Sequence, residues 1–420
     1  MSNSNISKRL AQVQPGTLHA GVDLALEENL VIVIDDYARK RTGFKFPQDA
    51  DGYRYFLKKL EELRVKVGAG QVVVAMEPTN FFWKLLANHL EQEQWPYHLV
   101  NPYTVKKHRE GDQLDRSKDD PRDGFMIAEL DRTGKYTETR LQHGPYEELR
   151  QYATLYYQLN KSLRREKTIL WGLVGQVFPE LRQAFKQLNG ITVKALLCTC
   201  PAAVSVRALS EADFLGQVQA AFAGTRIHLA KLRQAYRLAS TSIGLEEGLR
   251  ANQLAIQIHL DQLEMLEKKR LQVIAALKAC LQEVEVAAYL LSIQGLSSLS
   301  VALLLAEIGD PAYYQNGAQL VKLAGIQPVP NISGRKQRSR TPMSHLGRAR
   351  LRTVLYFACL RLVRVDLRFN QRYQELQTRA KNPLTKMQAL GVLMNKLLHI
   401  VWALIQHKTF YNPAEVVLTA

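Results

Sequence analysis

The sequence predicts an α/β domain at the N-terminus, followed by a long helical middle region and a mostly helical C-terminal domain. Three observations support this order. Strand-like apolar runs disappear beyond Pro145, helical spacing of Leu, Ile and Ala replaces them, and 420 residues are too many for one ordinary core. We expect a flexible N-terminus (1–16), an α/β domain (17–145), a helical linker and dimerisation region (146–286) and a basic C-terminal domain (287–420).

The N-terminal domain opens with a predicted β-hairpin, because residues 18–35 read apolar, short polar turn, apolar. A third strand is expected at Phe44–Phe46. The later elements of this domain are a helix over 51–66, a strand in QVVVAMEP over 71–78, a helix over 81–93 and a strand over 97–100. Three strands, helix, strand, helix and strand is the order of a ribonuclease H-like domain.

Acidic residues stand at the predicted strands of this domain. Asp23 lies in an apolar strand, where a charge is costly unless something positive meets it, and Glu77 ends the apolar run VVVAME. Asp120 and Asp123 have the i, i+3 spacing that puts both on one face of a helix. Together they form the four-carboxylate set of a two-metal nuclease.

Each acid also has a structural interpretation. Asp119, Asp120 and Asp123 could be caps at a helix N-terminus, and Glu77 could be a solvated strand end. Asp119 competes with Asp120, because Asp119 and Asp123 share a helix face at i, i+4 spacing.

The charge balance points to a polyanionic partner. Lys and Arg outnumber Asp and Glu by 56 to 39, which gives a net charge of +17, and nucleic acid is the first candidate. We find no apolar run of about 18 residues and no signal peptide, so we expect a cytoplasmic protein without a membrane contact. The four cysteines lack the spacing of a zinc site and are interpreted as buried thiols.

The most basic stretch of the chain contains a serine that could act as a nucleophile. Ser333 is followed by Gly334, Arg335 and Lys336, and no acidic residue occurs between Asp310 and Asp366, an interval with ten Lys or Arg. Such a loop could lower the pKa of a hydroxyl and let it attack a phosphodiester, or it could be a basic loop whose serine only hydrogen-bonds a phosphate. The expected nucleic-acid contacts here are Arg335, Lys336, Arg338, Arg340, Arg348, Arg350 and Arg352.

The middle region combines a basic helix with long helical stretches. Arg164, Arg165 and Lys167 follow Tyr152, Tyr156 and Tyr157, a mixture that suits RNA or single-stranded DNA, although a solvated face with its tyrosines in the core explains it equally well. The spacing over 215–281 suits long antiparallel or coiled helices, and an ordinary helical bundle remains the alternative.

The C-terminal domain begins with a predicted helix-hairpin-helix-like turn. Gly295 stands in a tight turn, and a helix is expected from Ser298 to Ile308. Turn amides of this kind can hold a DNA phosphate, but Ser297 occupies the place of the usual second glycine.

These segments resemble the insertion-sequence one-ten transposases, also called DEDD transposases, which are related to the Piv and MooV DNA invertases. The resemblance spans most of the chain. Its N-terminal part consists of GVDLA, VVVAMEPT, the K-x-D-x-x-D pattern and LRREKTIL through VFPEL; its C-terminal part consists of LSIQGLSSLSVALLLAEIGDPAYY, LVKLAGIQPVP, SGRKQR and FNQRYQEL.

The resemblance implies a RuvC-like domain with Asp23, Glu77, Asp120 and Asp123 as ligands of Mg²⁺ or Mn²⁺, and it favours Asp120 over Asp119. It implies Ser333 as a nucleophile that forms a transient phosphoserine link to DNA. The family's serine motif usually reads S-G-G-K, whereas Arg335 replaces the second glycine here. The implied partners are donor and target double-stranded DNA, a structured noncoding guide RNA and further copies of the chain in a dimer or tetramer, in a prokaryotic nucleoid.

Two other functions remain open at this point. A RuvC-like junction nuclease would use the same acids with water as nucleophile, but would leave the SGRK segment unexplained. A non-catalytic DNA- or RNA-binding protein would use the acids structurally. A covalent protein–DNA adduct distinguishes the transposase from both alternatives.

Overall fold

The computed structural model describes residues 9, 15–78, 80–111, 120–137, 140–329, 332–333, 336–337 and 342–414; for 109–111, 120, 332–333 and 336–337 it describes the backbone alone. The chain divides into two compact units, residues 1–141 and 142–420, and each is described by itself. Most of the expected flexible segment 1–16 lies outside the described residues.

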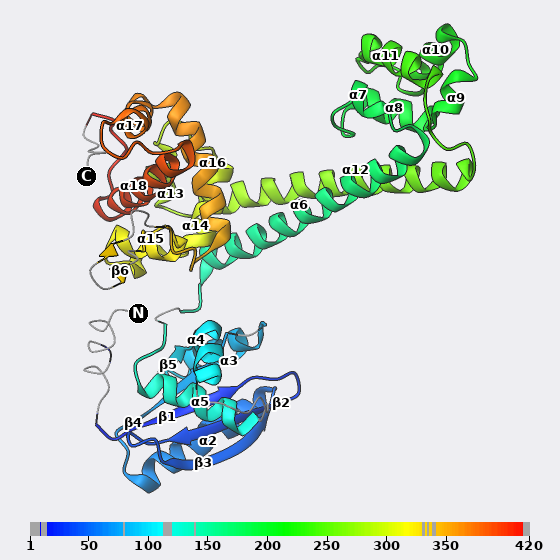
Figure 1. The fold of residues 1–420 in the computed structure, drawn as a ribbon. Coiled ribbons are helices and arrows are strands. Elements are labelled where there is room, and N and C mark those ends of the chain that lie inside the picture. Colours follow the sequence, from blue (N-terminus) through cyan, green and yellow to red (C-terminus); the bar gives the residue numbers. More distant parts are fainter. Residues whose placement is uncertain are drawn as a thin grey trace. The chain divides into compact units, whose positions relative to one another are not determined.

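The first unit contains a five-stranded mixed sheet (Figure 1). Its order is β3-β2-β1-β4-β5, with β1 antiparallel to β2, β2 antiparallel to β3, and both β1–β4 and β4–β5 parallel. The strands are β1 (Thr17–Asp23), β2 (Glu28–Ile34), β3 (Lys40–Pro47), β4 (Gln71–Met76) and β5 (Tyr97–Leu99). The predicted hairpin and the three later strands are confirmed.

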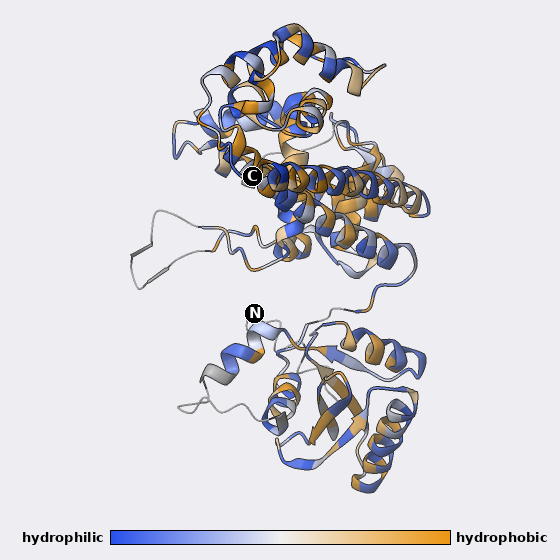
Figure 2. Cartoon of the chain, turned by 90° about the vertical axis from the view of Figure 1, so that its right-hand side faces the viewer, coloured by the Kyte–Doolittle hydropathy of each residue, from blue (hydrophilic) through white to orange (hydrophobic). Residues whose placement is uncertain are grey.

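Helices cover both faces of this sheet. On one face, α2 (Ala50–Val67) and α3 (Phe82–Gln92) pack on alternate strand residues such as Leu18 and Val74. On the other face, α5 (Asp120–Arg132) packs on Ile32 and Ala75, and α4 (Pro102–Gly111) lies next to α5. The three middle strands, β2, β1 and β4, are largely apolar on both faces because both are covered, and Figure 2 shows strands in orange between the helices.

The second unit contains an arm of two long helices, α6 (Gly144–Val177) and α12 (Leu249–Gln282), each of 34 residues (Figure 1). The helices are antiparallel, because the start of α6 shares a core with the end of α12 and the end of α6 shares a second core with the start of α12. Five short helices join them at the far end of the arm: α7 (Leu181–Ala184), α8 (Ile191–Thr199), α9 (Ala203–Arg207), α10 (Glu211–Ala221) and α11 (Leu229–Ser240).

This arrangement differs in part from the prediction for residues 215–281. The long partner of α12 is α6, and residues 215–240 belong to short helices instead. Gly224 and Gly248, with φ of 84° and 67°, hold left-handed backbone between α10 and α12, and a long helix cannot continue through it.

The base of the arm packs into the C-terminal helices around one apolar core. These elements are α13 (Ala287–Leu291), α14 (Ser298–Ile308), η1 (Pro311–Tyr313), α15 (Gly317–Ala324), β6 (Ile332–Ser333), β7 (Lys336–Gln337), α16 (Ala349–Val365), α17 (Leu367–Thr378) and α18 (Lys386–His407). The predicted helix Ser298–Ile308 is confirmed, and Ser297 is its N-cap, accepting a hydrogen bond from the Ser300 amide at 3.1 Å. Among the described helices, α18 alone is long and apolar enough to cross a membrane, but half of its apolar window is buried in this core.

Candidate active site

Asp23 and Glu77 come at the same ends of two neighbouring parallel strands. Val22 of β1 and Met76 of β4 are register partners, and Asp23 and Glu77 are the next residues along the two strands. Neighbouring strands lie about 4.8 Å apart, so the two backbone positions are adjacent. The strand pairing therefore delivers two of the four predicted acids to one edge of the sheet.

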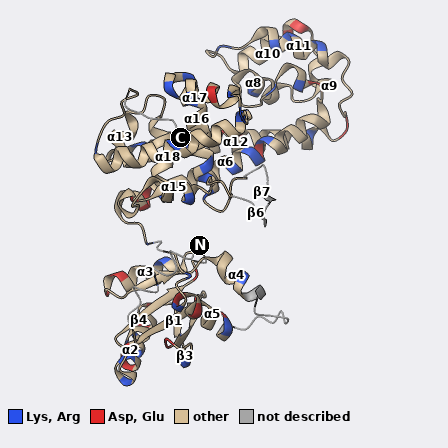
Figure 3. Ribbon diagram, turned by 60° about the vertical axis from the view of Figure 1, so that its left-hand side comes forward, with Lys and Arg blue, Asp and Glu red and all other residues tan. Residues whose placement is uncertain are grey.

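Both acids belong to the face of the sheet that α5 covers. Successive strand residues point to opposite faces. Leu18, Ala20 and Val22 contact the α2 and α3 side, whereas Gly21 contacts α5; Asp23 therefore follows the α5 side. In the same way Ala75 packs against α5 residues, and Glu77, two residues further, falls on that side. Figure 3 shows acidic ribbon segments beside the labels of β1 and α5.

The first turns of α5 lie directly on β1. A Cβ atom built on Gly21 would come within 2.0 Å of the carbonyl oxygen of Gly124 and within 2.5 Å of the Ala128 amide nitrogen. Further along α5, Asp131 contacts His19, so α5 runs antiparallel to β1 and its N-terminal end lies toward Asp23. Asp123 precedes Gly124 and is 8% exposed.

The chemistry of this set fits a divalent cation. Carboxylate oxygens are the ligands that Mg²⁺ and Mn²⁺ prefer, and all four candidates are Asp or Glu. The strand register and the Gly21–Gly124 contact bring the backbones of Asp23, Glu77 and Asp123 to one end of α5. Within the described part of the chain, which omits the Asp120 side chain, no three His, Cys, Asp or Glu side chains converge closely enough to hold a metal ion.

A buried His–Asp–His network joins the other end of α5 to the sheet. Asp131 is 1% exposed; its Oδ2 lies 2.7 Å from Nδ1 of His19 on β1, and its Oδ1 lies 2.6 Å from Nδ1 of His98 on β5. Burial alone would raise the pKa of Asp131, but the hydrogen bonds from His19 and His98 outweigh it and lower the pKa below its ordinary value. The sequence interpretation missed this network, and its one signal was a histidine inside the apolar run LHAGVDLA.

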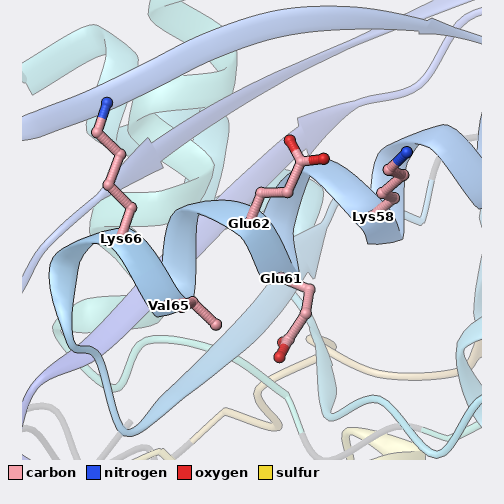
Figure 4. A pocket seen from close by; sticks show the side chains of 5 residues that line it. All are labelled: Lys58, Glu61, Glu62, Val65 and Lys66. Carbon is pink, nitrogen blue, oxygen red and sulfur yellow. The ribbon is translucent and has the colours of Figure 1, made fainter.

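The opposite side of the sheet offers no competing acidic site along α2. The pocket there is lined by Lys58, Glu61, Glu62, Val65 and Lys66, all from one exposed helix face (Figure 4). Its charges largely balance, and Glu61 also pairs with Arg64 at 2.6 Å. These residues are interpreted as a solvated helix face.

Ser333 lies in a β-ribbon of the second unit. Ser333 of β6 pairs with Lys336 of β7, and the two strands run antiparallel as a two-stranded ribbon. The ribbon is closed at its base, where the Val329 amide donates to Pro342 O at 2.8 Å and the Ser344 amide donates to Gln327 O at 3.0 Å. The side chains of Ser333, Arg335, Lys336, Arg338 and Arg340 lie outside the described residues.

Three of the expected DNA contacts lie at the start of α16 and bind groups of neighbouring helices. Arg348 donates to the Glu307 carbonyl of α14, and Arg352 donates to the carbonyls of Ala324 at 2.9 Å and Gly347 at 3.2 Å. Arg350 stacks over the Tyr157 ring, 4.7 Å from its centroid, and donates to Thr154 of α6 at 3.2 Å. These arginines therefore have structural contacts in addition to any contact with DNA.

A half-buried glutamate completes this basic cluster. Burial raises the pKa of Glu307, although Arg348, Arg350 and Arg150 act against the shift. Burial, and then the nearby Arg348, lower the pKa of Arg150. Arg150 of α6 and Arg348 and Arg350 at the start of α16 thus surround the carboxyl group of Glu307, which leaves a surplus of positive charge at this place.

The predicted RNA-binding helix is only partly free for a partner. Arg164 and Arg165 of α6 are exposed, whereas Lys167 lies 3.7 Å from Glu267 of α12. Tyr152, Tyr156 and Tyr157 pack against the C-terminal core, as the alternative interpretation expected.

Models of two protein families match two separate stretches of the chain. A model of DEDD transposases of the IS110 type matches residues 20–179, and a model described as transposase IS116/IS110/IS902 family matches residues 287–374. The first match begins within β1 and extends through all of α6, and the second includes α13 to α16, the Ser333 ribbon and part of α17. The chain belongs to the IS110 family of transposases. The family resemblance stated from the sequence is confirmed, and so is its enzymatic class, a transposase that acts on DNA.

Three relatives are similar to this IS110 transposase over different spans. The mini-circle transposase assigned to IS117 in Streptomyces coelicolor is 24% identical over 340 residues, which cover 76% of this chain and 78% of the relative. A family 20 transposase of Pseudomonas aeruginosa is 30% identical over 30% of this chain and 36% of its own length. A 42 kDa protein of insertion element IS900 from Mycobacterium paratuberculosis is 29% identical over 29% of this chain and 30% of its own length.

Proposed function

We propose that this transposase cuts and rejoins DNA with two groups of residues, the carboxylates Asp23, Glu77, Asp120 and Asp123 and the hydroxyl of Ser333. The observation that carries the proposal is the pairing of Val22 with Met76, which makes Asp23 and Glu77 neighbours under the N-terminal end of α5. A structural role for the acids does not require two carboxylates side by side on one covered face.

The sheet topology supports a ribonuclease H-like, RuvC-like assignment of the first unit. An antiparallel β3-β2-β1 half continued by parallel β4 and β5 is the arrangement that this fold uses. Asp23 ends the central strand β1, Glu77 directly follows the neighbouring strand β4, and the other two acids belong to the helix that crosses β1.

Asp23, Glu77, Asp120 and Asp123 would hold Mg²⁺ or Mn²⁺. When bound, the cation supplies positive charge to the scissile phosphate and stabilises the charge that develops in the transition state. Gly21 and Gly124 let α5 approach β1 without an intervening side chain, which fixes the position of Asp123 relative to Asp23.

Ser333 would supply the nucleophile. Its Oγ forms an ester bond to the scissile phosphorus as the bond from phosphorus to a deoxyribose oxygen breaks, and that oxygen leaves with a proton. Attack by a deoxyribose hydroxyl of another strand then reverses the step, restoring a phosphodiester and the free serine. Arg335, Lys336 and Arg338 follow in the same cationic segment and would stabilise the pentavalent phosphate.

We further propose a structured guide RNA and a homo-oligomer as partners. The exposed Arg164 and Arg165 on α6 support an RNA contact, since their side chains stand on an open face of the arm. The carboxylates and the serine belong to different units, so an active site assembled from two or more copies is compatible with this division.

The test traps the reaction on a DNA substrate and assays for a protein–DNA species that survives denaturant. Wild type should give this species and Ser333→Ala should not, while DNA binding stays within about twofold. Ser344→Ala is a matched control, because Ser344 lies in the same ribbon and its amide, which remains, makes the ribbon bond. An adduct from Ser333→Ala, or complete strand exchange by it, would favour the junction-nuclease alternative with water as nucleophile.

A further inference from the structure

The helices α7 to α11 form a small unit at the far end of the arm, hereafter the distal unit (residues 181–240; Figure 1). It has its own core, which includes Phe185, Phe214 and Leu232 and continues into the ends of α6 and α12. The distal unit lies between the segments that the two family models match. The proposed function, which uses the carboxylates and Ser333, gives the distal unit no role.

A cavity of about 630 Å³ opens in the distal unit. Its walls come from the end of α7, the segment between α7 and α8, the first turn of α8, and the segment before α11 with the first turn of α11. The lining residues are Gln183, Ala184, Phe185, Lys186, Gln187, Asn189, Gly190, Ile191, Thr192, Val193, Arg226, His228 and Lys231. No Asp or Glu belongs to this lining.

The Lys and Arg side chains that line the cavity differ in their ion pairs from other Lys and Arg side chains of the distal unit. Lys194, Arg207 and Arg233, outside the lining, pair with Glu267, Glu246 and Glu211. Lys186, Arg226 and Lys231 line the cavity and are exposed, and none of them has an ion pair to a described residue. Lys231 is held over the Phe185 ring, 5.6 Å from its centroid. Three uncompensated positive charges therefore converge on one concave surface.

The neutral groups of the cavity also favour an anion. Gln183, Gln187 and Asn189 carry side-chain amides that can donate hydrogen bonds to phosphate oxygens. The walls are joined by a hydrogen bond from the His228 amide to Oγ of the buried Thr192, at 3.1 Å. The cavity is thus tied together by its own backbone and is not a gap between loose loops.

We propose that this cavity binds a phosphodiester of duplex DNA away from the recombination point. The enzyme's family acts on DNA, and a concave basic site without acidic residues suits its backbone, which contributes affinity without sequence information. An arm of 34-residue helices is about 51 Å long, which corresponds to roughly 15 base pairs at 3.4 Å each. Under the proposed function, in which the C-terminal half binds the scissile DNA, the distal unit is a second DNA contact one to two helical turns away.

The test compares random-sequence duplexes of 12 and 30 base pairs, of which only the longer one can span the arm. The variant is the full chain with Lys186→Gln, Arg226→Gln and Lys231→Gln; the control is the full chain with Lys194→Gln, Arg207→Gln and Arg233→Gln, which removes the same charge from the same unit. Affinity is measured from 50 to 200 mM salt, and circular dichroism with thermal melting checks that both proteins are folded.

Wild type and control should bind the 30-base-pair duplex more tightly, per binding site, than the 12-base-pair duplex. The variant should bind the two duplexes with the same affinity per site. If the three cations each contact a phosphate, the slope of log K against log salt concentration should be about 2.7 less steep for the variant than for wild type. Between 50 and 200 mM salt the variant should therefore lose about 40-fold less affinity than wild type loses. An unchanged length dependence and slope in the variant, or an equal loss in the control, would overturn the proposal. The same measurements with a structured RNA form the second arm: loss of RNA binding with intact DNA length dependence would assign the cavity to RNA instead. None of these outcomes depends on Ser333 or on a metal.

Discussion

Gly124 of α5 lies against Gly21 of β1 so closely that one methyl group on Gly21 would come within 2.0 Å of the Gly124 carbonyl oxygen. This contact sets the distance between the helix that carries Asp120 and Asp123 and the strand that carries Asp23. Helix and strand can approach in this way only where both lack a side chain at the crossing point.

The first prediction replaces Gly21 with valine. Valine cannot fit without moving α5 away from β1, so strand cleavage should fall at least 100-fold and the free energy of unfolding of the first unit should drop by about 1–3 kcal/mol. Cleavage assays and thermal melting measure the two effects. Gly172→Ala on α6 is the control, because its Cβ meets no atom within 4 Å and alanine there should leave cleavage intact. Normal cleavage by Gly21→Val would show that the crossing does not position the acids.

The second prediction concerns the carboxylates. Asp23→Asn should abolish strand cleavage and weaken the stabilisation of the protein by Mn²⁺ in a thermal-shift titration, with DNA binding unchanged, because an amide cannot supply the charge of a carboxylate. Asp51→Asn is the matched control, since Asp51 is exposed on α2 and pairs only with Arg54 among the ion pairs of the described residues. Recombination at a normal rate by Asp23→Asn would show that this residue is not a metal ligand.

The third prediction concerns stability and pH. The folded state lowers the pKa of Asp131, so its ionised carboxylate stabilises the fold; this stabilisation is complete above about pH 5 and is lost as the pH falls below the unfolded pKa of about 3.9. Asp131→Asn should therefore cost about 3 kcal/mol at neutral pH. The difference between wild type and variant should shrink in acid, as measured by denaturant unfolding at several pH values. An equal difference at pH 3 and pH 7 would mean that the charge of Asp131 is not what stabilises the network.

The fourth prediction tests the RNA contact on the arm. Arg164→Glu with Arg165→Glu should weaken binding of a structured RNA and flatten its salt dependence, because two phosphate contacts would be replaced by repulsion. Lys268→Glu with Lys269→Glu is the control, because these residues are exposed on α12 of the same arm. If both pairs leave the RNA affinity and the salt slope unchanged, the arm is not part of the RNA interface.

Local features of the chain could be predicted because they depend on neighbours in sequence. The apolar, polar, apolar pattern of residues 18–35 corresponds to β1 and β2, and the β-branched run before Glu77 corresponds to β4. The predicted helix Ser298–Ile308 corresponds to α14. The expectation that Asp23 and Glu77 come from neighbouring strands agrees with the parallel pairing of β1 and β4, whereas their role as metal ligands stays a prediction.

Contacts between distant residues could not be predicted in the same way. His19 and Asp131 are 112 residues apart, and no periodicity links them. The apolar spacing of α12 fits any long helical partner, so the sequence could not select α6, which lies on the other side of the distal unit. The basic residues form a group in the sequence, but their spacing does not distinguish Arg348 and Arg352, which bind carbonyl groups of α14 and α15, from exposed residues such as Arg164.

The lengths of the two arm helices also set the distance between the C-terminal core and the distal unit. Each residue removed from both α6 and α12 would shorten the arm by about 1.5 Å and would turn each helix by about 100° about its own axis, which moves the apolar residues of each helix out of the seam between them. A loss of one or two residues from each helix would therefore disrupt the packing of α6 on α12, whereas a loss of seven from each helix, nearly two full turns, would keep the apolar seam and change only the length of the arm. The arm can consequently become shorter or longer in steps of whole helical turns. Each step changes the distance along the DNA at which the distal unit contacts a phosphate.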